Sequence, residues 1–204
     1  IDMGLHSLLA LSDGTTVDNP RWLRTSLAKL RVAQRRLDRR KKGSAHRRQA
    51  AFRVTRLHEQ IANRRRDFWH KVTRQLVDAY GLIALEDLTL KFIYANHHLA
   101  LSAHDAGLGE FQRLLTYKAE SAGTTVATVN PAYTSQACSG CDVIVEKDLS
   151  VRVHHCPDCG LTLDRDVNAA RHILFLAIES ARMGRSGINV QETTLPRSLR
   201  SSSP

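Results

Sequence analysis

The apolar residues of the chain gather in runs that are typical of strands at three places. Residues 1–11 are mostly apolar, a Ser-Asp-Gly turn sequence occupies 12–14, and residues 15–17 resume with β-branched side chains, which predicts a β-hairpin. Residues 82–85 form a continuous apolar run, and residues 124–130 are rich in threonine and valine. These two segments predict further strands, the first of them buried.

Two helical patterns lie between the predicted hairpin and the second strand. Pro20 suits the first position of a helix, and apolar residues recur on one face after it. Gly43 interrupts this pattern, and a second, longer one follows and ends at Gly81. The two segments predict a long antiparallel helical hairpin with arginines outside and an apolar seam inside. The seam residues expected in the second helix are Phe52, Leu57, Ile61, Phe68, Val72 and Leu76.

Helical spacing returns in the second half of the chain. Residues 107–123 predict a helix that ends at a glycine, and the apolar run at 171–180 predicts another helix. Residues 91–106 have mixed polarity and predict a loop or a short helix. Residues 183–204 are polar and turn-rich, so we expect them to be largely disordered. The order of the elements predicts a mixed α/β sheet with two insertions.

The charge of the chain is distributed very unevenly. Residues 21–74 contain 19 of the 30 lysines and arginines but only 3 acidic residues, which gives this segment a net charge of +16. Because the whole chain carries +10, the remainder carries −6. A solvated helical face is one explanation, but so many unbalanced charges repel one another without a counter-anion. We therefore expect a polyanion as partner, most simply the phosphate backbone of a nucleic acid.

The composition is that of a globular protein, with 42% hydrophobic and 25% charged residues among 204. No run approaches the roughly 20 apolar residues of a membrane span, and the start of the chain does not have the pattern of a signal peptide. Paired cysteines suited to metal binding favour a reducing environment, so we expect a cytoplasmic location. The chain begins at Ile1 without an initiator methionine, which indicates a processed chain or a piece of a longer one.

All four cysteines occur in two C-x-x-C pairs that are separated by 14 residues. The pairs are Cys138 with Cys141 and Cys156 with Cys159. This spacing predicts a zinc ribbon, in which four thiolates hold one structural zinc and leave no position for water. Two disulfides, or four unrelated buried thiols, are the alternative. His154 and His155 could replace a sulfur ligand, but we expect solvated loop residues because the cysteines already fill the coordination shell.

Three carboxylates stand at the ends of predicted elements. Asp2 lies on the first strand, Glu86 follows the buried run at 82–85, and Asp166 opens the last helix. Brought together, they would supply oxygen ligands for two Mg²⁺ or Mn²⁺ ions, which can activate a water and stabilise the leaving oxygen of a phosphodiester. The alternatives are that Asp2 is an exposed strand-end residue and that Asp164 or Asp166 merely caps the helix.

Several motifs, taken in order along the chain, resemble the transposon-encoded OrfB/TnpB family, whose RuvC-like nuclease domain is similar to that of type V CRISPR effectors. They are Asp2-Met-Gly, Leu85-Glu86-Asp87-Leu88, NPAYTSQACSGC with the second C-x-x-C pair, and Asp164-Arg-Asp166-x-Asn168-Ala-Ala. The resemblance runs from about Ile1 to Leu176.

The resemblance implies an RNase H-like (RuvC-like) fold with the basic helical hairpin as one insertion and the zinc ribbon as another. It implies a catalytic triad of Asp2, Glu86 and Asp166, where Asp166 is preferred to Asp164 because the family's acid stands two residues before the asparagine. The implied activity is RNA-guided cleavage of DNA, with guide RNA and DNA as partners. The implied segments are 1–18 and 81–132 for the RuvC-like domain, 19–80 for the hairpin, 133–163 for the ribbon, 164–182 for the final helix and 183–204 for the tail.

The chain departs from the family pattern at its start. Family members carry an N-terminal β-barrel with a helical recognition insert that reads the guide RNA and the target-adjacent motif, whereas only Ile1 precedes the catalytic acid here. We expect a Mg²⁺-dependent DNA endonuclease domain. Two alternatives are a catalytically silent nucleic-acid-binding remnant that acts in transposition as a regulator, and a structural zinc-ribbon adaptor for protein partners. Binding that falls steeply with salt and needs no divalent ion would favour the remnant.

Overall fold

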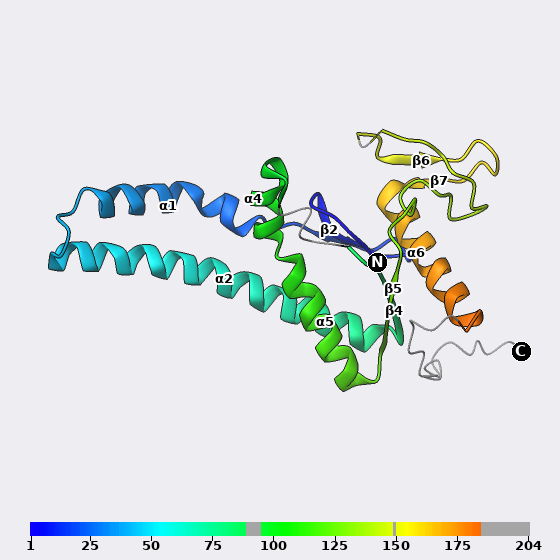
Figure 1. Ribbon diagram of the computed structural model, residues 1–204, viewed down its shortest axis with the longest axis horizontal. Coiled ribbons are helices and arrows are strands. Elements are labelled where there is room, and N and C mark those ends of the chain that lie inside the picture. The colour runs from blue at the N-terminus through cyan, green and yellow to red at the C-terminus, as the bar shows by residue number, and fades with distance from the viewer. Residues whose placement is uncertain (89–94, 149, 185–204) are drawn as a thin grey trace, which may run out of the picture.

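The computed structural model of the chain describes residues 1–88, 95–148 and 150–184. The tail that we expected to be disordered from residue 183 lies outside the described residues from 185 onward. Within the described part, a small α/β body carries a long helical hairpin on one side and a cysteine-containing ribbon on the other (Figure 1). No helix of the described part combines the length and the apolarity that crossing a bilayer requires.

Three short antiparallel strands form the first sheet. They are β1 (Asp2–Met3), β2 (Ser7–Ala10) and β3 (Thr16–Asp18), in that order across the sheet. The prediction of a single hairpin was therefore wrong by one strand. The additional reversal lies at Gly4, whose N–H donates to the Leu8 carbonyl at 3.2 Å. A Cβ at Gly4 would lie 2.8 Å from the Ser7 carbonyl oxygen, so the chain can turn this tightly only with glycine there.

The predicted strands at 82–85 and 124–130 are confirmed. They are β4 (Leu82–Glu86) and β5 (Thr125–Val129), which pair in parallel. Helices α4 (His97–Ala106) and α5 (Leu108–Ala122) lie in the connection between them. The backbone nitrogen of Ile1 donates to the Ala84 carbonyl at 2.8 Å, and β1 contacts β4. The edges of the two sheets therefore meet at β1 and β4.

The expected helical hairpin is formed by α1 (Trp22–Asp38) and α2 (Ala45–Ala79), which pack side by side (Figure 1). The first helix starts two residues later than Pro20 predicted. The Asp105 carboxylate of α4 accepts the N–H groups of Leu23 and Arg24 at 2.7 and 3.1 Å, so a residue far along the chain fixes this helix start. The second helix is capped locally, because the Ser44 hydroxyl accepts the Arg47 N–H at 3.2 Å.

The expected seam of α2 is correct near the body and wrong at its far end. Ile61, Val72 and Leu76 are buried, and Leu57 and Phe68 are half-buried. Phe52, however, is 62% exposed, because the sheet and α5 do not reach this half of α2 and only one face of it meets α1. The fully buried Trp69 was not predicted; its indole N–H donates to the Ala106 carbonyl at 2.9 Å, and its ring packs on Phe111.

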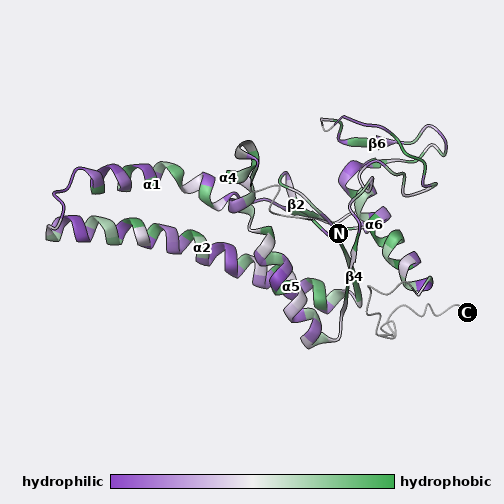
Figure 2. Cartoon of the chain, in the orientation of Figure 1, coloured by the Kyte–Doolittle hydropathy of each residue, from purple (hydrophilic) through white to green (hydrophobic). Residues whose placement is uncertain are grey.

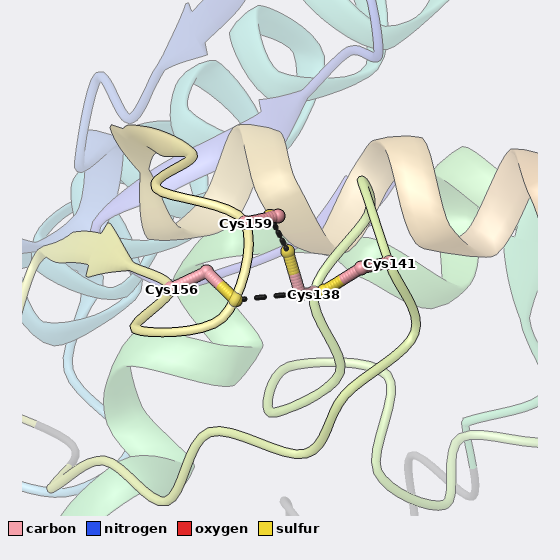
Figure 3. Close-up of side chains that lie close together, drawn as sticks. All are labelled: Cys138, Cys141, Cys156 and Cys159. Atoms are coloured by element: carbon pink, nitrogen blue, oxygen red, sulfur yellow. Dashed lines mark hydrogen bonds between the residues drawn. The ribbon is translucent and has the colours of Figure 1, made fainter.

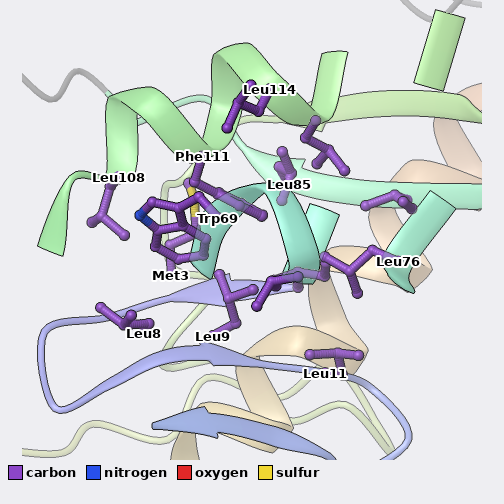
Figure 4. Close-up of a cluster of buried hydrophobic side chains, with 14 of the residues drawn as sticks. Met3, Leu8, Leu9, Leu11, Trp69, Leu76, Leu85, Leu108, Phe111 and Leu114 are labelled. Carbon is purple, nitrogen blue, oxygen red and sulfur yellow. The ribbon is translucent and has the colours of Figure 1, made fainter. Parts of the chain in front are cut away.

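Helices cover both faces of the strands. On one face, side chains of β2 and β4 pack with α2 and α5 in the larger core (Figure 4). Its members include Leu8, Leu9, Trp69, Leu76, Leu85, Phe111 and Leu114. On the other face, Ala84, Ala127 and Val129 pack against Ile173 and Ala177 of α6 (Arg165–Arg182). This arrangement of helix, sheet and helix follows from the alternation of side chains along a strand.

The cysteine ribbon follows β5 and precedes α6 in the sequence. It contains the antiparallel pair β6 (Val153–His155) and β7 (Thr162–Asp164), and an isolated bridge between Ala137 and Ile144. Strand β7 runs directly into α6, since Asp164 ends the strand and caps the helix. The ribbon is therefore joined rigidly to the start of α6.

Candidate active site and metal-binding ribbon

Strand alternation sends the first two candidate acids to the same face of the sheet. Ile1 and Met3 belong to the core that contains α2 and α5, so Asp2 between them points to the opposite face. Ile83 and Leu85 belong to that same core, whereas Ala84 packs against α6, and Glu86 continues the series of Ala84. Both carboxylates therefore emerge on the α6 side, where Asp166 lies in the first turn of that helix.

The electrostatics of Asp2 reflect this convergence. The pKa of Asp2 is raised from 3.8 to about 7, chiefly by burial and also by the negative charges of Glu86 and Asp166. The pKa of Glu86 is also raised by burial, although a hydrogen bond that it accepts from the Thr134 hydroxyl opposes the shift. Asp2 is therefore close enough to both other acids for their charges to oppose its ionisation.

Asp166 is held by arginines and is free of the capping role. Arg165 Nε lies 3.2 Å from Asp166 Oδ1, and Arg152 lies 3.4 Å from Oδ2. The cap of α6 is Asp164, whose Oδ1 accepts the N–H groups of Asp166 and Val167 at 2.8 and 3.1 Å. Of the two helix-start acids, Asp164 is therefore engaged by the backbone and Asp166 by side chains.

Asp2 and Asp166 line a common cavity of about 430 Å³. Its polar lining also includes Lys147, Arg152 and Arg165, so the cavity offers carboxylates beside cationic groups. Within the described ranges, however, only the four cysteines bring three or more metal-ligand atoms within 4.8 Å of one another. The three carboxylates therefore do not approach one another this closely, and Glu86 is not among the residues that line the cavity.

The four predicted cysteines converge on one point (Figure 3). The sulfurs of Cys138 and Cys159 are 3.7 Å apart, those of Cys141 and Cys156 are 3.5 Å apart, and all four lie within 4.8 Å of one another. These separations are well beyond a disulfide bond of about 2.05 Å, and all four thiols are free, which rules out the disulfide alternative. The N–H of Cys159 makes the largest of several contributions that lower the pKa of Cys156. The cluster can hold one metal ion.

The histidines beside Cys156 do not belong to this metal-ligand cluster. His155 is exposed, as predicted, and shares a hydrogen bond of 2.8 Å with the Thr162 hydroxyl. The prediction of a solvated His154 was wrong. Its side chain is fully buried, and Nδ1 contacts the amino group of Lys147. Burial, and secondly the charge of Lys147, lower the pKa of His154. Side chains alternate along the short strand β6, so His154 points inward while Val153 and His155 on either side are exposed.

Two residues of the motifs hold the site together in ways that the sequence analysis did not assign. Asn168 of α6 is fully buried; its Nδ2 donates to the Ala137 carbonyl at 2.7 Å and its Oδ1 accepts the Ser139 N–H at 2.9 Å. It thereby ties the first cysteine turn to the helix that carries Asp166. Thr134, in the segment before the cysteines, holds Glu86. Their occurrence in NPAYTSQ and DRDVNAA was the only signal in the sequence.

Comparisons with known proteins agree with this architecture. The family model described as "Probable transposase" matches residues 1–96, and the model described as "Cas12f1-like, TNB domain" matches residues 109–173. A "Putative RNA-guided DNA endonuclease" of Streptomyces pristinaespiralis is 38% identical over 203 residues, which cover 92% of this chain and 50% of that protein. The "Putative RNA-guided DNA endonuclease InsQ" of Escherichia coli K12 is 36% identical over 190 residues, with 85% and 47% covered.

Among solved structures, the Cas12f1 chain of a cryo-EM complex with sgRNA and target DNA superimposes with a TM-score of 0.57 at 17% identity. The match covers 84% of this chain and 47% of the Cas12f1 chain, and it shows a shared fold. The chain spans about half the length of the relatives that it matches. The two family models between them cover most of the chain, and with these relatives they show that it belongs to the OrfB/TnpB family.

Proposed function

We propose that this chain is the catalytic portion of a transposon-associated, RNA-guided DNA endonuclease. The observation that carries the proposal is that Asp2 feels the charges of both Glu86 and Asp166, and that Asp2 and Asp166 line a cavity together with cationic side chains. The relatives described as RNA-guided DNA endonucleases match along nearly the whole chain, which supports the same chemistry here.

We propose further that the body is an RNase H-like, specifically RuvC-like, domain. The antiparallel strands β1 to β3 adjoin the parallel pair β4 and β5 through the edge contact of β1 with β4, which supports such a mixed sheet. The basic hairpin then forms an insertion between β3 and β4, and the ribbon forms another between β5 and α6.

The carboxylates would hold two Mg²⁺ or Mn²⁺ ions, because hard cations take oxygen ligands. Two ions about 4 Å apart, each about 2 Å from its ligands, let carboxylate oxygens stand up to about 8 Å apart, so three acids need not lie within 4.8 Å of one another to bind a pair of ions. The ions would supply a polarised water and stabilise the departing oxygen of a cleaved phosphodiester.

The residues of the chain itself have separable roles in this proposal. The hydroxyl of Thr134 fixes one oxygen of Glu86, so that carboxylate is oriented in advance. Arg152 and Arg165 orient Asp166 and offer positive charge to a phosphate that enters the cavity. Asp2, with a pKa of about 7, has to lose its proton before it can act as a ligand. The hairpin supplies a positively charged surface for guide RNA and DNA.

We propose that the four-cysteine cluster binds a structural zinc. Four thiolates at 2.3 Å from a tetrahedral zinc lie about 3.8 Å from one another, close to the 3.5 and 3.7 Å between paired sulfurs here. Zinc would stiffen the cysteine turns, and Asn168 would pass that rigidity to α6 and Asp166. Zinc-bound thiolates fit a reducing cytoplasm.

A cleavage assay tests the nuclease proposal. The purified chain, incubated with labelled DNA, guide RNA and Mg²⁺, should give products that disappear with Glu86→Gln or Asp166→Asn and without divalent ions. Asp148→Asn is the matched control, since Asp148 lines the same cavity but is not among the proposed ligands. Cleavage that survives Glu86→Gln and Asp166→Asn would overturn the assignment. Binding that persists without cleavage under any divalent ion would favour the nucleic-acid-binding alternative.

A further inference from the structure

A groove of about 600 Å³ runs between α1 and α2 in the half of the hairpin that lies away from the body. Small and aliphatic side chains form its floor: Ala28, Val32, Ala33, Ala50 and Leu57. The small side chains of the alanines leave the space between the two helices unfilled. Val32 remains 49% exposed, so this floor is accessible to a partner.

The charged residues that line the groove are all cationic. The groove carries five basic residues and no acidic one: Lys29, Arg36, Arg40, Arg53 and Arg56. All five are exposed, and none takes part in an ion pair with another described residue. Figure 2 shows hydrophilic residues along both helices of this hairpin. The apolar residues of the groove can contact flat apolar groups, and the cationic residues can bind negative charges. The groove therefore fits a ligand in which such groups and charges alternate.

The groove also offers groups that can bind the edges of bases. His46, Gln49 and Gln60 line it, and glutamine presents a donor and an acceptor side by side. The exposed ring of Phe52 lies one helical turn before Arg56 and can stack on a base at the rim. A purely aliphatic protein helix would leave these polar groups unpaired, which favours nucleobases over an apolar peptide.

We propose that this groove binds unpaired bases of an RNA strand, with the neighbouring phosphates on the arginines of the rim. A volume of about 600 Å³ lies within the range of small-molecule sites, roughly 300 to 1,000 Å³, and suits one or two nucleotides. This inference rests on the proposed function, because it names the place where the guide RNA is held.

The groove lies far from the candidate active site. Its position therefore favours a bound guide RNA as the ligand, and not the DNA strand that is cut. Leu57 in the groove and Leu76 in the core are 19 residues apart on α2, which corresponds to about 28 Å along the helix. The strand that is cleaved has to enter the cavity at Asp2 and Asp166, which lies beyond that core. A strand seated at this end of the hairpin is therefore anchored away from the reacting phosphate.

The test compares an unstructured RNA of about 12 nucleotides with an abasic oligomer that has the same number of phosphates. Binding is measured by fluorescence anisotropy without added divalent ions. We expect the natural RNA to bind about 5-fold or more tightly than the abasic oligomer, because each stacked base contributes about 1 kcal/mol or more. The deoxy oligomer of the same sequence should bind more weakly than the RNA.

Two pairs of variants locate the effect. Ala50→Leu fills the floor and should abolish the difference between natural and abasic RNA, whereas Ala51→Leu, one residue outside the groove lining, should preserve it. Phe52→Ala should reduce the difference, and Tyr117→Ala, which removes an equally exposed ring from α5, should leave it unchanged. Circular dichroism of each variant reports whether the helices persist.

The inference fails if abasic and natural RNA bind equally, or if Ala50→Leu and Ala51→Leu behave alike. Equal affinity for the deoxy oligomer would overturn the assignment to RNA. Binding in the absence of divalent ions does not depend on the carboxylates, so these outcomes are distinct from a failure to cleave DNA.

Discussion

Replacement of Asp2 by asparagine should stabilise the fold at the expense of the proposed metal site. In the folded protein the pKa of Asp2 is raised from 3.8 to about 7, chiefly by burial and then by Glu86 and Asp166. The folded state therefore holds the proton more tightly than the unfolded state. This favours folding fully below pH 4, and the advantage is lost as the pH rises toward 7.

The magnitude follows from the size of the shift. A change of roughly 3 pKa units at 1.36 kcal/mol each corresponds to about 4 kcal/mol between pH 4 and pH 8. Asparagine keeps the shape of the side chain but carries no charge. We therefore expect Asp2→Asn to raise the free energy of unfolding at pH 8 by up to about 4 kcal/mol, which raises Tm by up to about 16 °C in a chain of this size.

The assay is thermal and urea denaturation of the wild type and the variant between pH 5 and pH 8, without divalent ions. The gain should shrink steadily as the pH is lowered. Asp18→Asn, which removes an exposed carboxylate from β3, is the control and should give no such gain. A variant that is less stable than the wild type at pH 8, or a gain that does not depend on pH, would refute the raised pKa of Asp2 in the folded protein.

Three further predictions concern the groups around the acids. Cys141→Ser should release the bound metal and lower Tm, as measured by metal content and calorimetry; retention of one equivalent of zinc would contradict the four-cysteine site. Asn168→Ala leaves two backbone groups without partners and should cost about 2 to 4 kcal/mol in denaturation, with metal content unchanged; a cost near zero would show that this residue does not join ribbon and helix. Thr134→Val removes the hydrogen bond that lowers the pKa of Glu86, so the pH–rate profile of cleavage should move to higher pH; an unmoved profile would separate Thr134 from the site.

Local spacing, the ends of predicted elements and the motifs brought these residues of the candidate site to attention. The cysteines converge because each C-x-x-C turn is local and the two turns sit on short hairpins, so their sequence positions alone predict the cluster. Asp2 and Glu86 lie on one face because each follows the two-residue period of its own strand. The motif also separated Asp166 from Asp164, which caps α6.

The features that could not be predicted from the sequence depend on contacts between distant segments of the chain. The start of α1 is set by Asp105, about 80 residues away in the chain, so the local signal at Pro20 misplaced it. Phe52 was expected in the apolar seam of α2 and Trp69 was not, yet Phe52 is exposed and Trp69 is buried, because the body covers only part of this helix. The periodicity of apolar residues identifies the apolar face of a helix. It does not show over what length other elements pack against that face.

The central claim is that Asp2, Glu86 and Asp166 act together as ligands of divalent ions, and direct metal binding tests it without any need for cleavage. Mn²⁺ titration followed by electron paramagnetic resonance should detect binding to the zinc-loaded wild-type chain above pH 7. Glu86→Gln and Asp166→Asn should each weaken that binding at least about tenfold, which corresponds to about 1.4 kcal/mol, while Asp148→Asn should leave it intact. Mn²⁺ affinity that is the same in all four proteins would contradict the claim.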